Sequence, residues 1–148
     1  MLECLLARNL AVLNVLQVVE KYIDAVRRGD ASALPLHRDA VCVFPLNTYR
    51  GSASFAAALN AFTKIVRNIK VIRLIVDGEH CVAILEIDTV HGEIPFAEHI
   101  HVIDGEIVAI RAYYDPRPIL AASGTDKRKR VAQLLRTAYL PVMSRDVF

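Results

Sequence analysis

The stretch IPFAEHIHV, residues 94–102, decides how the chain folds, because its alternating pattern predicts a β-strand. One face of this strand is apolar except at its centre and carries Ile94, Phe96, Glu98, Ile100 and Val102. The opposite face carries Ala97, His99 and His101. An ionised carboxylate in apolar surroundings costs several kcal/mol unless it is paired. The pattern therefore predicts a concave site built around Glu98.

Three further β-rich runs accompany this strand, at residues 71–76, 81–90 and 107–114, while the central run extends over residues 94–103. Hairpin signals separate them, at Asp77-Gly78, His91-Gly92 and Asp104-Gly105. We therefore expect an antiparallel meander in the second half of the chain.

The turn at His91 decides which residue lies opposite Glu98 in this meander. A two-residue turn at His91-Gly92 places Leu85 opposite Glu98 and leaves the face apolar. A three-residue turn places Glu86 there and creates a like-charged pair. The sequence leaves both arrangements open.

The first half of the chain is mainly helical. Apolar side chains repeat with helical spacing over residues 10–28, and Gly29 ends that helix. Asp30 or Ser32 is expected to cap a short helix containing Leu34 and Leu36.

A short strand and another helix complete the first half. Residues 41–44 predict a strand near a sheet edge, since Pro45 stops it. The next helix opens at Gly51-Ser52, and one side of it carries Phe55, Leu59, Phe62 and Val66. Helices followed by an antiparallel meander predict an α+β fold with the helices on one face of the sheet.

Composition bounds the class of protein. The 148 residues suffice for one domain, and 54% of them are hydrophobic. A net charge of +2 gives no basis for binding nucleic acid or an anionic membrane. Cys4, Cys42 and Cys81 are too widely spaced for a disulfide framework or a zinc site, which favours a cytoplasmic location. No stretch approaches the roughly 20 apolar residues that span a bilayer.

Two further motifs, a histidine pair and a basic run near the C-terminus, do not by themselves indicate a binding site. His99 and His101 have a spacing that can chelate a metal, but no third firm ligand is evident, so no metal site is predicted. Residues 126–139 predict an amphipathic helix that begins with the basic run at 127–130. That run is interpreted as a solvated helix face.

The order of these elements resembles the nuclear-transport-factor-2-like superfamily, in its SnoaL-like and ketosteroid-isomerase-like branch. The matching segments are residues 19–23, 28–30, 39–45, 50–51, 104–107 and 113–116. They place a SnoaL-like core at residues 11–118 of a single domain 1–148, followed by a C-terminal helical extension at 119–148. The resemblance implies a cone-shaped curved antiparallel sheet that packs against N-terminal helices and encloses an apolar pocket. It also implies a homodimer packed through the outer sheet face.

The resemblance assigns roles to three residues. Tyr22 stands where ketosteroid isomerases keep the oxyanion-hole tyrosine. Glu98 stands where they keep an acid that its apolar surroundings hold in the protonated form. Their general base is replaced by Phe44, which cannot abstract a proton, so steroid isomerisation by the standard route is not expected. SnoaL-like cyclases use one carboxylate on the sheet, which Glu98 can supply. Limonene epoxide hydrolases fit less well, because Phe96 and Ala112 replace two of their charged residues.

Strand alternation extends the expected pocket beyond the catalytic candidates Glu98 and Tyr22. Ligand contacts are expected from Cys42, Phe44, Phe96, Ile100, Ile110 and Tyr114. The outward face is expected to pair two copies of the chain, through Val82, Ile84, Val90, His99, His101 and Tyr113.

The function expected from these features is small-molecule binding by a SnoaL-like protein. An isomerase- or cyclase-type reaction would use single-carboxylate acid–base chemistry on an apolar cyclic ligand, without a cofactor. The alternative is a non-catalytic ligand-binding or dimerisation module of the same fold. A weaker alternative is an accessory subunit that docks through its C-terminal helix.

Overall fold

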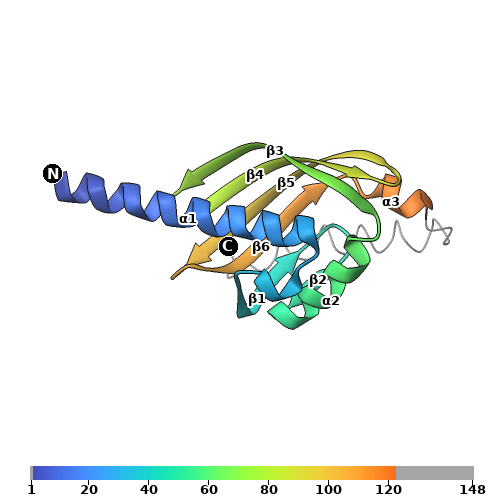
Figure 1. Cartoon of the computed structure of the whole chain (residues 1–148), viewed down its shortest axis with the longest axis horizontal. Helices are drawn as coiled ribbons and strands as arrows, with labels where there is room; N and C mark the ends of the chain where they lie inside the picture. The colour runs from blue at the N-terminus through green and yellow to red at the C-terminus, as the bar shows by residue number, and fades with distance from the viewer. Residues whose placement is uncertain (1, 123–148) are drawn as a thin grey trace.

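A computed structural model describes residues 2–122. Residue 1 and residues 123–148, with the helix expected at 126–139, lie outside the described residues. The elements follow in the order α1 (Leu2–Arg28), a 3-10 turn η1 (Ala31–Ala33), β1 (Leu36–Val43), β2 (Thr48–Arg50), α2 (Ser52–Phe62), β3 (Val66–Asp77), β4 (His80–Thr89), β5 (Gly92–Ile103), β6 (Glu106–Tyr114) and α3 (Arg117–Ala122) (Figure 1).

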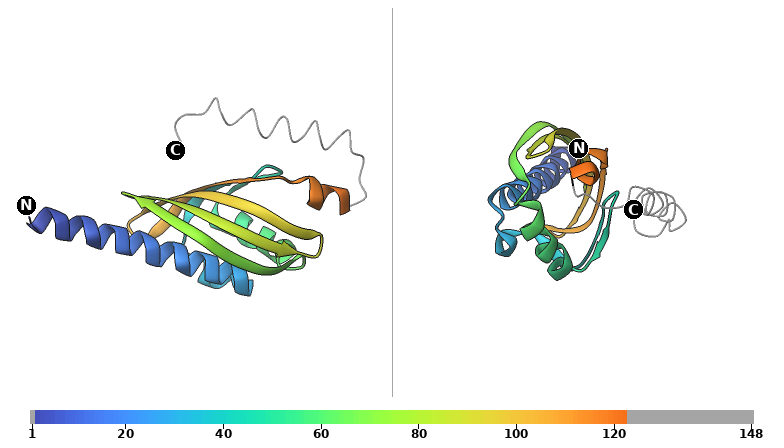
Figure 2. Two further views of the ribbon diagram at one scale, coloured as in Figure 1. Left: turned by 90° about the horizontal axis from the view of Figure 1, so that it is seen from above. Right: turned by 90° about the vertical axis from the view of Figure 1, so that its right-hand side faces the viewer.

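The strands form one six-stranded sheet in the order β2-β1-β6-β5-β4-β3. All neighbours are antiparallel except β1 and β6, which run parallel. Register shifts interrupt the pairing of β1 with β6, of β3 with β4 and of β5 with β6, and such bulges bend a strand and increase its twist. Seen end-on in Figure 2, the sheet curls around α1 and α2. The expected α+β fold with a curved sheet is confirmed.

The two long helices cover the concave face of the sheet, and the core lies between the layers. The buried face of α1 consists of Val15, Val18, Val19, Tyr22, Ile23, Ala25 and Val26. The Arg27 guanidinium donates a hydrogen bond of 2.9 Å to the carbonyl of Ile69, which joins the end of α1 to β3. The N-terminal part of α1 extends past the sheet (Figure 1). Leu10 of this helix is exposed. None of the described helices is long and apolar enough to cross a membrane.

The strand parity expected for β5 is confirmed. Ile94, Phe96, Glu98 and Ile100 are all buried on the concave side. His99 lies on the outer face, where its ring stacks on that of His80.

The turn between β4 and β5 differs from both arrangements left open by the sequence. Thr89 pairs with Gly92, so the turn consists of Val90 and His91, and Ala83 lies opposite Glu98. The buried Thr89 hydroxyl holds this turn, donating to the Gly92 carbonyl at 2.7 Å and accepting from the His91 amide at 3.0 Å. The face around Glu98 nevertheless stays apolar.

Two expected helix boundaries are wrong. Only Ala31–Ala33 form a helical turn after Asp30, because Leu34 precedes a proline and adopts the extended conformation. Leu36 therefore opens β1. Val66, expected on the second helix, opens β3 instead. β1 is the second strand from the edge of the sheet, in agreement with the prediction from Pro45.

Candidate functional site

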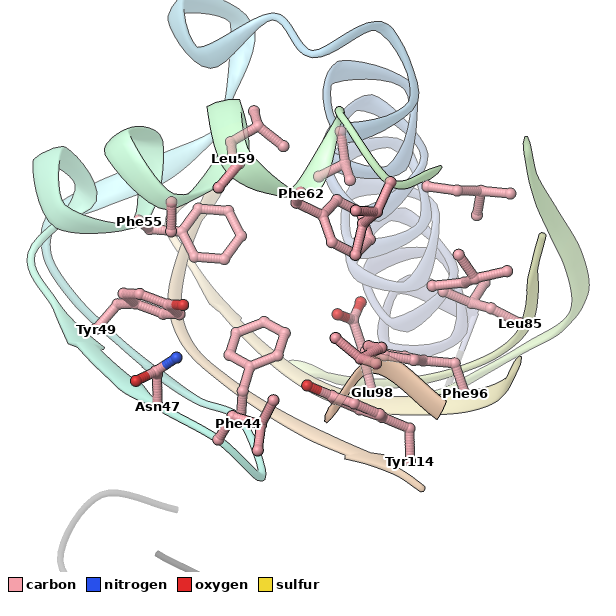
Figure 3. A pocket seen from close by; sticks show the side chains of 18 of the residues that line it. Phe44, Asn47, Tyr49, Phe55, Leu59, Phe62, Leu85, Phe96, Glu98 and Tyr114 are labelled. Atoms are coloured by element: carbon pink, nitrogen blue, oxygen red, sulfur yellow. The ribbon is translucent and has the colours of Figure 1, made fainter. Parts of the chain in front are cut away.

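A cavity of about 230 Å³ lies between the concave face of the sheet and the helices. Its lining comes from α1, α2, α3, from β2 to β6, and from the segments between β1 and β2 and between α2 and β3. Most of the lining side chains are aliphatic or aromatic, and Figure 3 shows them around a common space. Polar groups within such a lining are largely desolvated, as Glu98 is.

Glu98 occupies the wall of this cavity between two small side chains. Its partners on the neighbouring strands are Ala83 on β4 and Ala112 on β6. Because neither alanine covers it, the carboxylate points into the cavity, as Figure 3 shows, although only 4% of the residue is exposed. The position is therefore buried and open to a ligand at once.

Tyr22 provides the hydrogen bond that Glu98 receives. The helical spacing of α1 places Tyr22 on its buried face, and the hydroxyl donates to Oε1 of Glu98 over 3.2 Å. The two residues are 76 positions apart in the sequence, so only the packing of α1 on β5 brings them together.

Burial sets the protonation of this pair. Desolvation raises the pKa of Glu98 to about 7, while the hydrogen bond from Tyr22 opposes that rise. Burial and the neighbouring Glu98 raise the pKa of Tyr22 well above its usual value. Near neutral pH Glu98 can thus both donate and accept a proton, whereas Tyr22 remains a hydrogen-bond donor.

Aromatic rings form much of the remaining wall. Phe44, Tyr49 and Phe55 contact one another, with ring centroids separated by 5.8 to 5.9 Å. Phe55 also contacts the ring of Tyr22. On the other side, Phe96 and Tyr114 stack with centroids 4.4 Å apart. Figure 3 shows both groups lining the space that the carboxylate of Glu98 also borders.

The structure brings together five of the eight site residues expected from the sequence. Glu98, Tyr22, Phe44, Phe96 and Tyr114 all line the cavity. The other three, Cys42, Ile100 and Ile110, face the same side of the sheet but belong to the hydrophobic core and not to the cavity lining. They lie on the inner face where the sheet is covered by packed side chains.

Sequence reasoning missed several lining residues. Phe55, Leu59 and Phe62 lie on one side of α2 and line the cavity opposite the sheet. Their helical spacing, which the sequence shows, was the signal that could have identified them as lining residues. Asn47 and Ile119 carried no such signal, because a loop and the short α3 supply them.

The histidines on the outer face form a stack remote from the cavity. Nε2 of His99 lies 3.1 Å from Nδ1 of His80, and the rings of His80 and His101 stack at 4.2 Å. His101 lies 3.6 Å from the carboxylate of Glu79. Among residues 2–122, no group of three or more side chains has an arrangement that would hold a metal ion.

Comparison with known proteins identifies the family. The model of the SnoaL-like domain matches residues 19–110, more than half of the chain. The chain therefore belongs to the SnoaL-like domain family, within the nuclear-transport-factor-2-like superfamily. No curated protein matches the sequence.

Solved structures show the same fold. A protein from Kribbella flavida is 25% identical, with a TM-score of 0.68 over 73% of this chain and 92% of its own. A steroid delta-isomerase from Pseudomonas aeruginosa is 26% identical, with a TM-score of 0.62 over 82% of this chain and 94% of its own. A protein from Catenulispora acidiphila with a ketosteroid-isomerase-like fold, in complex with trimethylamine, is 18% identical, with a TM-score of 0.62 over 74% of this chain and 93% of its own.

Proposed function

We propose that this protein binds a small, mainly apolar cyclic molecule in the cavity and acts on it by acid–base chemistry at Glu98. The observation that carries the proposal is the buried Glu98–Tyr22 pair, joined over 3.2 Å at the wall of an apolar cavity. Ligand sites are typically concave and apolar, with a few convergent polar groups. The steroid delta-isomerase among the similar structures lends further support to an isomerase-type reaction.

The chemistry follows from the positions of these groups. Glu98 transfers a proton to or from an enolisable or hydroxylated ligand. The Tyr22 hydroxyl donates its single proton to the ionised Glu98 at rest, and it turns to the negative charge that develops on a ligand oxygen once Glu98 has taken up a proton. Phe44 lies in the lining beside Phe55, so the position of the standard isomerase base offers an apolar wall. The proposal therefore rests on one carboxylate and needs no cofactor.

Blocking the cavity tests whether it is the binding site. Ala58 lines the cavity, whereas Ala57, its neighbour on α2, is exposed and does not. Ala58→Phe should abolish binding of cyclic ketones and alcohols measured by ligand-observed NMR, and Ala57→Phe should leave it intact. Equal binding by both variants would contradict a site in the cavity.

Turnover separates the enzyme from a binding module of the same fold. For a neutral ligand, Glu98→Gln should preserve binding and abolish hydrogen–deuterium exchange at the carbon next to a ketone. A ligand that binds the native protein without any exchange would favour the non-catalytic binding module.

We further propose that two copies pair through the outer sheet face. Val82, Ile84 and Tyr113 remain 36%, 38% and 56% exposed there. Ile84 and Tyr113 both flank Ala97 on β5, and Ile75 pairs with Val82, so these side chains form one patch. Large exposed apolar patches usually mark interfaces.

A further inference from the structure

The charges around the cavity restrict the ligand. Of the side chains that line it in the described part of the chain, none is lysine, arginine or histidine, and Glu98 is the acidic one. The Glu98 carboxylate accepts a hydrogen bond from the hydroxyl of Tyr22. A ligand carboxylate or phosphate would meet a like charge in a site of low polarity, so anionic ligands are disfavoured.

The aromatic walls favour the opposite charge. Aromatic rings carry negative charge on their faces and attract organic cations within about 6 Å of the ring centroid. The rings of Phe44, Tyr49 and Phe55 form an aromatic corner of the cavity, with centroids at most 5.9 Å apart. The ring of Phe55 also contacts that of Tyr22. In Figure 3 this corner and the Glu98 carboxylate border the same space.

A cation also resolves the cost of burying Glu98. Buried charges in proteins are normally paired, and the chain itself supplies no cationic side chain to the cavity lining in the described residues. A ligand ammonium group placed between the carboxylate and the aromatic corner would pair with Glu98, while the apolar body of the ligand fills the remaining space.

We propose that the cavity selects a protonated organic amine, whose ammonium group pairs with Glu98 against the aromatic corner of Phe44, Tyr49 and Phe55. This inference rests on the proposed binding of a small molecule in the cavity, not on the proposed acid–base reaction, and it narrows the ligand to one class. It also assigns Glu98 the ionised form in the complex.

A matched pair of probes tests it on the full chain. Cyclohexylmethylamine and cyclohexylmethanol share the same ring and differ in the charge of the polar group. Calorimetric titration at pH 5 and pH 8 gives their affinities. An aliphatic ammonium resembles that of lysine, with a pKa of about 10.4, and stays protonated at both pH values.

The expected pH dependence follows from the fraction of ionised Glu98. Its pKa of about 7 leaves roughly one part in a hundred ionised at pH 5 and most of it at pH 8. Affinity for the amine should therefore rise by up to about a hundredfold between these pH values, since only the ionised form is competent. The alcohol should change little.

Two variants separate the charge from the rings. Glu98→Gln should remove the pH dependence for the amine and lower its affinity at pH 8 to that of the alcohol. Phe44→Leu should weaken the amine by roughly two- to fivefold relative to the alcohol, as expected for one cation–π contact.

The outcomes distinguish this inference from the function on which it rests. Tighter binding of the alcohol than of the amine at pH 8, or amine binding that weakens as the pH rises, would overturn the amine class and leave small-molecule binding intact. Absence of binding by both probes and by the cyclic ketones would overturn both proposals.

Discussion

Glu98 differs from the other buried residues of the sheet because it is a carboxylic acid, and burying its ionised form lowers the stability of the fold. Its two strand neighbours, Ala83 and Ala112, are too small to cover it and carry no group that could pair with it. The hydroxyl of Tyr22 is its hydrogen-bond partner, over 3.2 Å. At the scale of single residues, the pH dependence of stability should therefore be that of a desolvated carboxylic acid that accepts a hydrogen bond from Tyr22.

The first prediction concerns stability and pH. The pKa of Glu98 is raised from 4.5 in the unfolded chain to about 7 in the fold, so the folded state binds more protons between these values. Stability from this residue is complete below pH 4.5 and is lost as the pH rises through 7. Each pKa unit is worth about 1.4 kcal/mol, so the loss is about 3 kcal/mol.

Urea unfolding of the native protein and of Glu98→Gln measures this loss. The free energy of unfolding of the native protein should fall relative to the variant between pH 5 and pH 8. Parallel pH profiles for the two proteins would show that Glu98 keeps an ordinary pKa.

The second prediction concerns Tyr22. Tyr22→Phe removes the hydrogen bond to Glu98, and a bond to an ionised group is worth roughly 1.5–3 kcal/mol. Stability should therefore fall more at pH 8, where Glu98 is ionised, than at pH 5. Because that bond lowers the pKa of Glu98, its loss should move the pKa further up, which carbon NMR of the carboxyl group measures. An unchanged pKa would show that the hydroxyl does not bind the carboxylate in solution.

At the scale of elements, the C-terminal ends of α1 and α2, two helices that line the cavity, approach each other closely at Gly29 and Thr63. Gly29 ends α1 with a positive φ of 67°, and a Cβ at this position would lie 2.8 Å from Cγ2 of Thr63. Thr63 follows α2 directly, and its amide donates to the carbonyl of Leu59 at 2.9 Å. The close approach of the two helix ends therefore requires glycine.

The third prediction compares this glycine with one that has free space. Gly78, in the turn between β3 and β4, has a φ of 58° and no atom near its missing Cβ. Gly78→Ala should cost about 1–2 kcal/mol from backbone strain alone, whereas Gly29→Ala should cost more because Thr63 must also move. Chemical denaturation measures both.

A second substitution checks the cause. Combining Gly29→Ala with Thr63→Ser removes the methyl group that obstructs the new side chain and should bring the loss down to that of Gly78→Ala. A double variant no more stable than Gly29→Ala would exclude contact with Thr63 as the reason.

At the scale of the whole molecule, the two faces of the sheet differ in what they contact. The concave face holds the core and the cavity, and the outer face presents Val82, Ile84 and Tyr113 together with the histidine stack. This division follows from strand alternation, because successive side chains along a strand point to opposite faces of the sheet.

The fourth prediction concerns assembly. Ile84→Lys should convert the proposed homodimer to a monomer in light scattering at micromolar concentration, because a charge would be buried at the centre of the patch. The matched control is Leu10→Lys, since Leu10 is also an exposed apolar residue but lies on α1 and not on the outer face of the sheet. A native protein that is monomeric at this concentration would contradict pairing through the outer face.

Local patterns explain which parts of the fold and the site could be predicted. The period-2 pattern around Glu98 placed it with Phe96 on the inner face, and helical spacing placed Tyr22 on the buried side of α1. Both patterns depend on side-chain direction, which neighbouring residues determine. The same reasoning correctly predicted four β-rich runs in the second half of the chain.

Features that depend on distant contacts could not be predicted. The register that sets Ala83 opposite Glu98 depends on the Thr89 hydroxyl in the turn and on a hydrogen bond of 2.8 Å from the Val90 amide to the Ile65 carbonyl. The parallel pairing of β1 with β6 joins the two halves of the chain, and no local signal indicates it.

The sequence by itself thus determined which side chains face inward, that one of them is an acid, and that a SnoaL-like α+β fold surrounds it. Only the tertiary structure decided that Cys42, Ile100 and Ile110 fill the core while Asn47 and Phe62 reach the cavity. The physical reason is that alternation specifies the side of a sheet, whereas the curvature of the sheet and the position of the helices specify where space remains on that side.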